Sequence, residues 1–245
     1  MNPPTLPRLL RSLLTLALAT AACAGHAADS KEPGTKVRVV LIGDSTVASK
    51  SGWGDAFGKL LGDRAEWFNE AKGGRSSKSF RDEGHWKTAL AHQPDWVLIQ
   101  FGHNDMPGKG PARETDPATT FPENLARYIE EARASGARPI LVTSLTRRNF
   151  QAGHLVRDLT GYVEATKRVA AEKKVPLVDL NARSIEQAEK LGADGLAELE
   201  PVGKQPGTKD HTHLNERGGE LVAPLIVEEL RKAAPELVKL LRAAG

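Results

Sequence analysis

Residues 37–46 read Val-Arg-Val-Val-Leu-Ile-Gly-Asp-Ser-Thr, an apolar, β-branched run that ends in a glycine and three polar residues. The run from Val37 to Gly43 predicts a buried strand, and Ser45 stands in the tight turn just past it. A hydroxyl at this place is presented at the carboxyl edge of the sheet, where open α/β sheets bind ligands. Ser45 is therefore a candidate functional residue, although serine and aspartate in such a turn are also favoured helix caps.

The chain beyond Lys36 alternates between short apolar runs and longer amphipathic stretches. This alternation is typical of a parallel sheet whose strands are joined by crossover helices, so the expected fold class is α/β. We predict five strands, at 37–43, 65–69, 96–101, 139–143 and 175–180. The third and fourth are continuous apolar runs, as strands buried on both faces should be.

Helical patterns fill the gaps between these strands. Thr120 and Glu123 have capping-box spacing, which predicts the start of a helix. Apolar residues at helical spacing predict another helix from about Leu155 to Glu172. The last helical region, 216–243, is interrupted by two prolines, and 192–208 is a candidate long loop of the kind that is often functional.

Length and composition describe a globular domain. With 40% hydrophobic and 27% charged side chains among 245 residues, the chain is too apolar to be disordered. A single cysteine excludes a disulfide scaffold. We expect one domain over residues 28–245.

The first 27 residues have the composition of a secretory signal peptide. Two arginines precede an apolar run from Leu13 to Ala22, and small residues up to Ala27 offer a cleavage site. The apolar run is too short to remain as a membrane span. Lipidation at Cys23 is the alternative, but Thr20 stands where a lipoprotein signal prefers leucine. We therefore expect an exported protein, periplasmic or extracellular, without a lipid anchor.

The formal net charge of +3 invites a nucleic-acid partner. However, Arg8 and Arg11 lie in the leader, which has no acidic residue. From residue 28 onward, 32 basic side chains face 31 acidic ones. A mature protein so close to neutral lacks the electrostatic basis for binding nucleic acid.

Two further polar segments follow the second and third predicted strands. Residues 69–76 contain the pair Gly73 and Gly74, and paired glycines let the backbone approach a ligand and point an N–H at an anion. Residues 101–105 place Asn104 at the end of the third strand, where its side chain offers an N–H. Taken singly, each segment is also consistent with a simple turn.

A fourth segment, Asp210-His211-Thr212-His213, comes just before the last helix. Asp210 precedes His213 by three residues and can accept from one ring nitrogen, which leaves the other nitrogen free as a base. The alternative is a metal site. We expect no metal and no cofactor, because the sequence has no H-E-x-x-H motif and no cysteine cluster.

In this order, the four segments resemble those of the SGNH hydrolase superfamily, and more closely those of the rhamnogalacturonan acetylesterase family, also called carbohydrate esterase family twelve. The resemblance extends from Val37 to the last helix, through the segments 43–46, 74–76, 102–105, 146–148 and 210–213. It implies a three-layer α/β/α flavodoxin-like fold with the strand order 2-1-3-4-5. The chain lacks the G-x-S-x-G elbow of α/β hydrolases.

The resemblance also implies a role for each site residue. Ser45 would be the nucleophile, His213 the base, and Asp210 the group that orients the imidazole. The oxyanion hole would consist of the backbone N–H groups of Ser45 and Gly74 and the side-chain amide of Asn104. His211 would lie outside the triad.

The implied substrate is an acetylated polysaccharide or oligosaccharide, with acetylated rhamnogalacturonan first and acetylated xylan second. Arg75, Arg147 and Arg148 stand near the expected site, and guanidinium groups can clasp uronate carboxylates, although a structural role for them is as plausible. Two alternatives remain: a hydrolase of short-chain esters or lipids, and a non-catalytic protein that binds polysaccharide. The sequence leaves the oligomeric state open.

Overall fold

The computed structural model describes Met1 and residues 35–203, 205 and 208–242. The predicted signal peptide at 1–27 and the lipidation alternative at Cys23 lie outside the described residues. Among those that are described, no helix is long and apolar enough to span a membrane.

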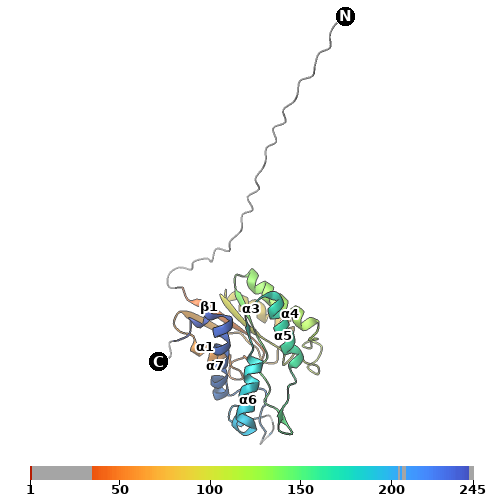
Figure 1. The fold of residues 1–245 in the computed structure, drawn as a ribbon, viewed down its shortest axis with the longest axis vertical. Helices are drawn as coiled ribbons and strands as arrows, with labels where there is room; N and C mark the ends of the chain where they lie inside the picture. Colours follow the sequence, from red (N-terminus) through yellow and green to blue (C-terminus); the bar gives the residue numbers. More distant parts are fainter. Residues whose placement is uncertain (2–34, 204, 206–207, 243–245) are drawn as a thin grey trace. The chain divides into compact units, whose positions relative to one another are not determined.

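Within the described residues, five parallel strands form the central sheet (Figure 1). The sheet has the order β2-β1-β3-β4-β7 and is made of β1 (Val37–Gly43), β2 (Ala65–Asn69), β3 (Trp96–Gln100), β4 (Arg138–Val142) and β7 (Leu177–Val178). This confirms the predicted α/β class, the five strands and the order 2-1-3-4-5.

The fifth strand is shorter than the predicted 175–180. Val175 donates its N–H to the carbonyl of Ala170 and so belongs to the end of the preceding helix. Asp179 already caps the next helix by accepting from the N–H of Ala182. Only Leu177 and Val178 remain to pair with β4.

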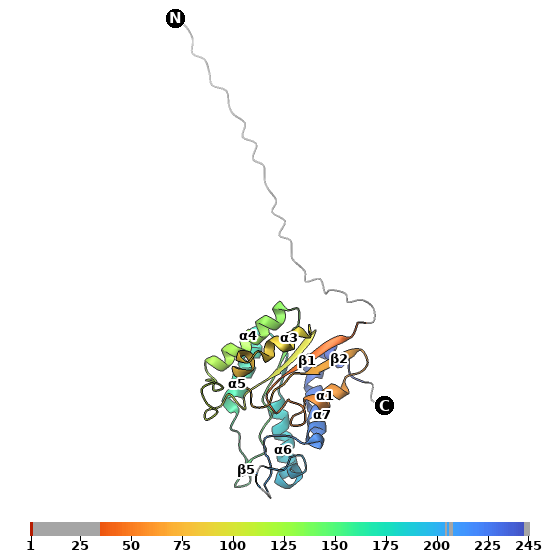
Figure 2. The ribbon, with the colours of Figure 1, turned by 180° about the vertical axis from the view of Figure 1, so that it is seen from behind.

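Helices cover both faces of the sheet (Figures 1 and 2). Because side chains alternate along a strand, Val39 and Leu41 of β1 enter one core, and Val40 and Ile42 enter the other. The first core is covered by α1 (Gly54–Leu60), α7 (Glu216–Ala233) and α8 (Pro235–Val238). The second is covered by α2 (Ser79–Asp82), α3 (His85–Ala91), α4 (Thr120–Ala134) and α5 (Thr160–Lys173). The result is the predicted three-layer arrangement.

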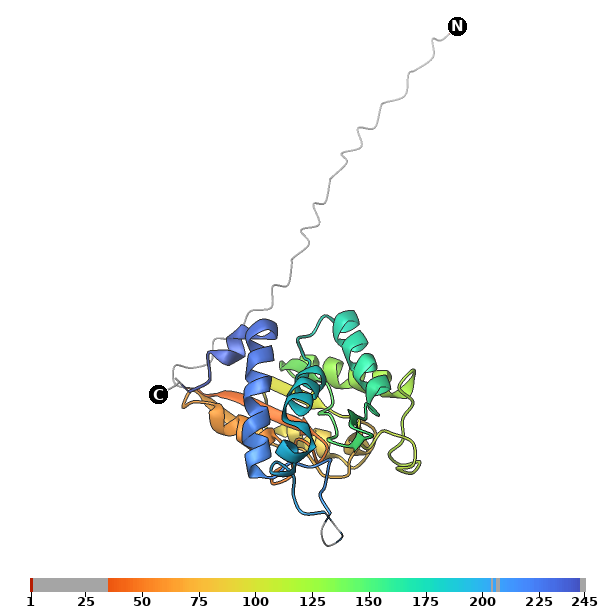
Figure 3. The same cartoon turned by 60° about the horizontal axis from the view of Figure 1, so that its bottom comes forward.

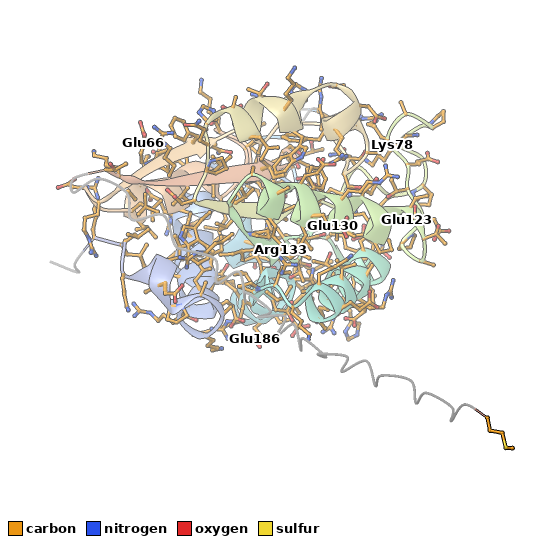
Figure 4. The ribbon with its side chains drawn as sticks, turned by 90° about the horizontal axis from the view of Figure 1, so that it is seen from above. Glu66, Lys78, Glu123, Glu130, Arg133 and Glu186 are labelled. Carbon is orange, nitrogen blue, oxygen red and sulfur yellow. The ribbon has the colours of Figure 1, made fainter. Side chains whose placement is uncertain are left out.

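The helix α4 shows how the sequence pattern is used. Phe121, Leu125 and Ile129 are buried against the sheet. The exposed residues of α4 include Glu123, Glu130 and Arg133, which are labelled in Figure 4. The helix is therefore amphipathic, as its sequence predicts.

The helix predicted from about Leu155 to Glu172 begins later than expected, at Thr160. The predicted start at Leu155 belongs instead to a hairpin of β5 (Phe150–Gln151) and β6 (His154–Leu155), whose turn residues Ala152 and Gly153 both have positive φ. Leu155 packs in a small cluster with Ala188, Leu196 and Leu199. Its apolar side chain is therefore partly buried against this cluster and not on the core-facing side of a helix.

The candidate loop at 192–208 is partly helical. The helix α6 (Leu180–Ala197) continues past Gly192, where the backbone breaks from helical geometry, so the irregular segment begins only at Glu198. The helix α7 also runs through Pro224, where an interruption was expected. It ends at Ala233, and the proline at 235 begins α8.

A close approach between strands positions the turn after β1. Gly43 pairs with Gln100 in the register of β1 and β3. A Cβ on Gly43 would lie 2.5 Å from the carbonyl oxygen of Gln100 and 2.7 Å from a methyl carbon of Val47. Glycine is thus required where the chain leaves β1 toward Ser45.

We expect Gly43→Ala to lower the free energy of unfolding by about 1–3 kcal/mol, because the added methyl group collides with the backbone carbonyl of Gln100 and with the buried side chain of Val47. Urea unfolding measures the change. Gly161→Ala in α5 is the matched control, since its Cβ would meet nothing closer than 3.4 Å. Alanine also favours a helix by up to about 1 kcal/mol. Equal destabilisation by the two substitutions would contradict this account.

Candidate active site

The candidate residues from the first three strands meet at one edge of the sheet. Ser45 follows β1, Gly74 follows β2 and Asn104 follows β3, and β1 lies between the other two strands. The N–H of Lys72 donates to the carbonyl of Gly43 over 3.0 Å, which ties the second segment to the end of β1. Three segments far apart in sequence therefore lie side by side.

A chain of hydrogen bonds runs from Ser45 to Asp210. The Oγ of Ser45 lies 2.7 Å from Nε2 of His213, and Nδ1 of the same ring lies 2.6 Å from Oδ2 of Asp210. An ionised carboxylate only accepts, so Nδ1 carries the proton and Nε2 is left to accept from the hydroxyl. The structure thus brings together the three residues singled out for nucleophilic chemistry.

The local geometry of the 210–213 segment favours an ionised Asp210. Its Oδ1 accepts from the backbone N–H groups of Thr212, at 2.9 Å, and His213, at 3.0 Å. Burial by itself would raise the pKa of Asp210, but the hydrogen bonds from the His213 ring and from these N–H groups lower it to about 2. The carboxylate is therefore charged at any pH near neutrality.

Hydrogen bonds attach this segment to the turn that carries Ser45. Leu214 donates its N–H to the carbonyl of Ser51 over 2.9 Å, and the hydroxyl of Ser51 donates to the carbonyl of Ser45 over 2.7 Å. Asn215 then caps α7 by accepting from the N–H of Gly218. The histidine and the serine are consequently held by one set of hydrogen bonds, although 168 residues separate them.

The segments of Gly74 and Asn104 also touch. The side-chain amide of Asn104 donates to the carbonyl of Arg75 over 3.2 Å, and Asn104 is 9% exposed. Gly74 has a φ of +78°, a left-handed conformation that favours glycine. A Cβ on Gly73 would lie 3.6 Å from the Cβ of Ser45. The segments that carry the candidate N–H donors therefore touch each other, and the segment of Gly74 lies next to Ser45.

A buried polar network holds the turn that carries Ser45 in place. Asp44 is fully buried and accepts from the N–H and the hydroxyl of Thr46, at 2.8 and 2.7 Å. Thr46 accepts from Gln100 over 2.6 Å, and Gln100 accepts from the indole N–H of Trp53 over 2.9 Å. The ring of buried His103 lies 3.4 Å from Asp44. Burial would raise the pKa of Asp44, but His103 and the Thr46 hydrogen bonds hold it below its usual value.

Asp105 joins the second and third segments. Its buried carboxylate accepts from the N–H and hydroxyl of Ser77, from the hydroxyl of Thr115 and from the N–H of Gly102. Burial raises the pKa of Asp105 to about 7, against the lowering effect of these donors. The sequence analysis did not identify the supporting roles of Asp44 and Asp105. Each of these carboxylates stands directly beside a candidate residue in the sequence, and that position is the signal that could have identified them.

The three candidate arginines have different surroundings. The side chain of Arg75 is 40% exposed and pairs with Glu83 over 2.7 Å. Arg147 is 16% exposed and pairs with Asp158. Arg148 is only 4% exposed and its Nε lies 3.1 Å from the buried carboxylate of Glu200. Arg148 therefore does not face a polymer, and its expected role as a uronate ligand is corrected.

The metal alternative for 210–213 gains no support from the geometry. His211 turns to Glu200, with Nδ1 2.9 Å from Oε2, while His213 is engaged with Asp210 and Ser45. Among the residues that the structure describes, no group of three or more histidine, cysteine, aspartate or glutamate side chains is arranged to hold a metal ion.

Comparison with known proteins shows that most of the chain is similar to acylhydrolases and esterases. The model of the GDSL-like Lipase/Acylhydrolase family matches residues 41–221. Rhamnogalacturonan acetylesterase RhgT of Bacillus subtilis is 37% identical over 213 residues, which cover 80% of this chain and 90% of that protein. Probable rhamnogalacturonan acetylesterase YesY of the same organism is 34% identical over 202 residues, covering 79% and 92%.

A solved structure agrees with the fold. The crystal structure of the Bacillus subtilis protein YxiM superimposes with a TM-score of 0.68 at 27% identity. The match covers 82% of this chain and 58% of the other, so this chain spans a little over half of that protein's length. The family model, the curated relatives and the fold agree with one another, and this chain belongs to the GDSL-like Lipase/Acylhydrolase family.

Proposed function

We propose that this protein is an exported serine acetylesterase that removes O-acetyl groups from a polysaccharide, with acetylated rhamnogalacturonan as the first candidate. The observation that carries the proposal is the hydrogen-bond chain from Ser45 through His213 to Asp210. The substrate class is supported by the relatives RhgT and YesY, which are named as rhamnogalacturonan acetylesterases.

The reaction proceeds through an acyl-enzyme on Ser45. Its hydroxyl oxygen attacks the acetyl carbonyl while Nε2 of His213 takes the proton, because an unassisted hydroxyl is a poor nucleophile at neutral pH. His213 returns that proton to the leaving sugar oxygen, and Asp210 stabilises the imidazolium meanwhile. Water then attacks the acyl-enzyme with His213 again as base, and acetate and free Ser45 are released.

Ser45, Gly74 and Asn104 stabilise the oxyanion that forms in each step. The donors are the backbone N–H groups of Ser45 and Gly74 and the amide of Asn104. The amide nitrogen of Asn104 carries two hydrogens, and only one is needed for its bond to the carbonyl of Arg75. The second hydrogen is available to the oxyanion.

The chemistry occurs in a single domain over residues 28–245 after removal of the signal peptide. Contacts group the described residues from Thr35 onward into one compact unit, which supports this domain assignment. The side chain of Arg75 is 40% exposed and pairs with Glu83, and it is the candidate arginine that we propose for binding a uronate carboxylate of the polymer.

The substrate is tested by measuring acetate release from acetylated rhamnogalacturonan, acetylated xylan, a simple acetyl ester and an octanoyl ester. Preference for the pectic polymer supports the proposal, and preference for xylan moves the substrate to that polymer. Faster hydrolysis of the octanoyl ester than of the acetylated substrates points to a lipid or other short-chain ester as the substrate. Polymer binding without any acetate release points to a non-catalytic binding protein.

We expect Ser45→Ala to reduce acetate release on the order of 10⁴-fold or more, because the nucleophile is lost. Ser49→Ala is the matched control, since Ser49 is exposed and bonds only to Asp55 in the described structure. The rates are compared at saturating substrate. Acetate release by Ser45→Ala at the rate of the parent protein would contradict the serine mechanism.

We expect kcat/KM to be higher at neutral than at mildly acidic pH, because the imidazole of His213 must be neutral to accept the proton. Since the pKa of Asp210 is lowered to about 2, its carboxylate stays ionised under both conditions and adds no second pH dependence. A pH profile with the simple acetyl ester measures this. A flat profile under conditions where chemistry limits the rate argues against His213 as the base.

We expect Asn104→Ala to lower kcat by about 10²- to 10³-fold with little change in KM, because the lost donor acts on charge that develops in the transition state. Steady-state kinetics measure both constants, and urea unfolding checks the fold. A raised KM with unchanged kcat would assign Asn104 to ordinary substrate binding instead.

A further inference from the structure

We infer that Arg148 is a positioning residue for His213, with Glu200 as its buried counter-charge. Its guanidinium holds the backbone at His213 in the place from which the imidazole reaches Ser45. This inference rests on the proposed role of His213 as the base and adds the device that supports it.

The two charges form a pair that is almost completely removed from water. The Nε of Arg148 lies 3.1 Å from Oε1 of Glu200, and the side chains are 4% and 2% exposed. Burying two charges costs solvation free energy, and removing one partner leaves the other charge uncompensated. A buried ion pair is therefore weak evidence for stability by itself, and this one lies next to a candidate site, where its hydrogen bonds can position other groups.

The same guanidinium is bonded to the segment that carries the base. One terminal nitrogen of Arg148 donates to the carbonyl of His213. The backbone N–H of Arg148 donates to the carbonyl of His211 over 2.8 Å. Arg148 follows β4, so these bonds tie the 210–213 segment to the sheet.

Glu200 supports that segment from the other side. Its second carboxylate oxygen lies 2.9 Å from Nδ1 of His211, and its carbonyl accepts from the side chain of Asn215 over 3.3 Å. The N–H of Asp210 donates to the carbonyl of Pro201 over 3.1 Å. Contacts from Glu200 and its neighbour therefore reach both ends of the segment.

The segment needs such support because it is not regular structure. It belongs to the connection between α6 and α7, two helices that lie alongside each other (Figure 3). In the described part of residues 198–215, the regular pairing before α7 is limited to an isolated bridge between Val202 and Lys209, and no helix or longer ladder orients the His213 side chain. A rigid, forked guanidinium can fix a carbonyl and a carboxylate at once, which a lysine cannot do in the same geometry.

The decisive variant replaces both charges, as Arg148→Met with Glu200→Met. It avoids an unpaired buried charge and still lacks the donor to the His213 carbonyl. We expect a folded protein whose kcat falls by about 10- to 100-fold while KM stays within about twofold, because a base displaced by about 1 Å costs that much. Arg81→Met with Glu131→Met is the matched control, since it removes an arginine–glutamate pair with bonds of 3.0 and 2.7 Å between α2 and α4. That control should retain the kcat of the parent protein.

Arg148→Lys provides a second test that keeps the charge of the pair. We expect this variant to fold and to lose about tenfold in kcat, because the ammonium cannot bond to Glu200 and the His213 carbonyl together. Wild-type kcat in either the folded double variant or Arg148→Lys would overturn the inference.

Proton NMR separates this inference from the proposed function. The Nδ1 proton between His213 and Asp210 should give a low-field signal in the parent protein and in the Arg81/Glu131 control, and the signal should weaken or shift in both Arg148 variants. An unchanged signal in these variants would contradict the positioning role whether or not acetate is released. Absence of Ser45-dependent acetate release from the parent protein, with the signal changes as expected, would overturn the proposed function alone.

Discussion

The parallel pairing of β1 with β2 on one side and β3 on the other is the constraint on which the site depends. Parallel strands all end at the same edge of a sheet, so the turns that follow these three strands are neighbours whatever their separation in sequence. Ser45, Gly74 and Asn104 each occupy one of those turns. A hydroxyl and a set of N–H donors are thereby gathered without any long-range contact between their side chains.

The close approach of β1 to β3 and a buried polar network favour one conformation of the chain at this edge of the sheet. Gly43 allows the turn after β1 to lie against the backbone of Gln100, and the Gln100 side chain joins Trp53 to Thr46. Buried polar groups destabilise a fold unless they find partners, and in this network the partners belong to the turn that presents Ser45. The network therefore favours one conformation of that turn, and Asp105 does the same for the segments of Ser77 and Gly102.

His213, the proposed base, is held in a different way from Ser45, the proposed nucleophile. Ser45 follows a strand directly, whereas His213 lies in an irregular connection between two helices. Loops that carry functional residues need a scaffold that positions them. Here the contacts come from Ser51 near Ser45, from Arg148 after β4, and from Glu200 in the connection between α6 and α7.

Short apolar strands, glycine turns and an Asp-x-x-His spacing are local patterns, and from them the amino-acid sequence indicated the α/β class and the candidates Ser45, Gly74, Asn104, Asp210 and His213. The strand order and the role expected of each candidate came from the family resemblance. Only the tertiary structure decided what Arg148 does. An arginine after a strand looks the same in sequence whether it faces a polymer or a buried glutamate. Its partner Glu200 is 52 residues away, in a segment without a periodic pattern. The extent of the 155–172 helix was misjudged for the same reason, because Leu155 satisfies its apolar character in a distant cluster that no local spacing reveals.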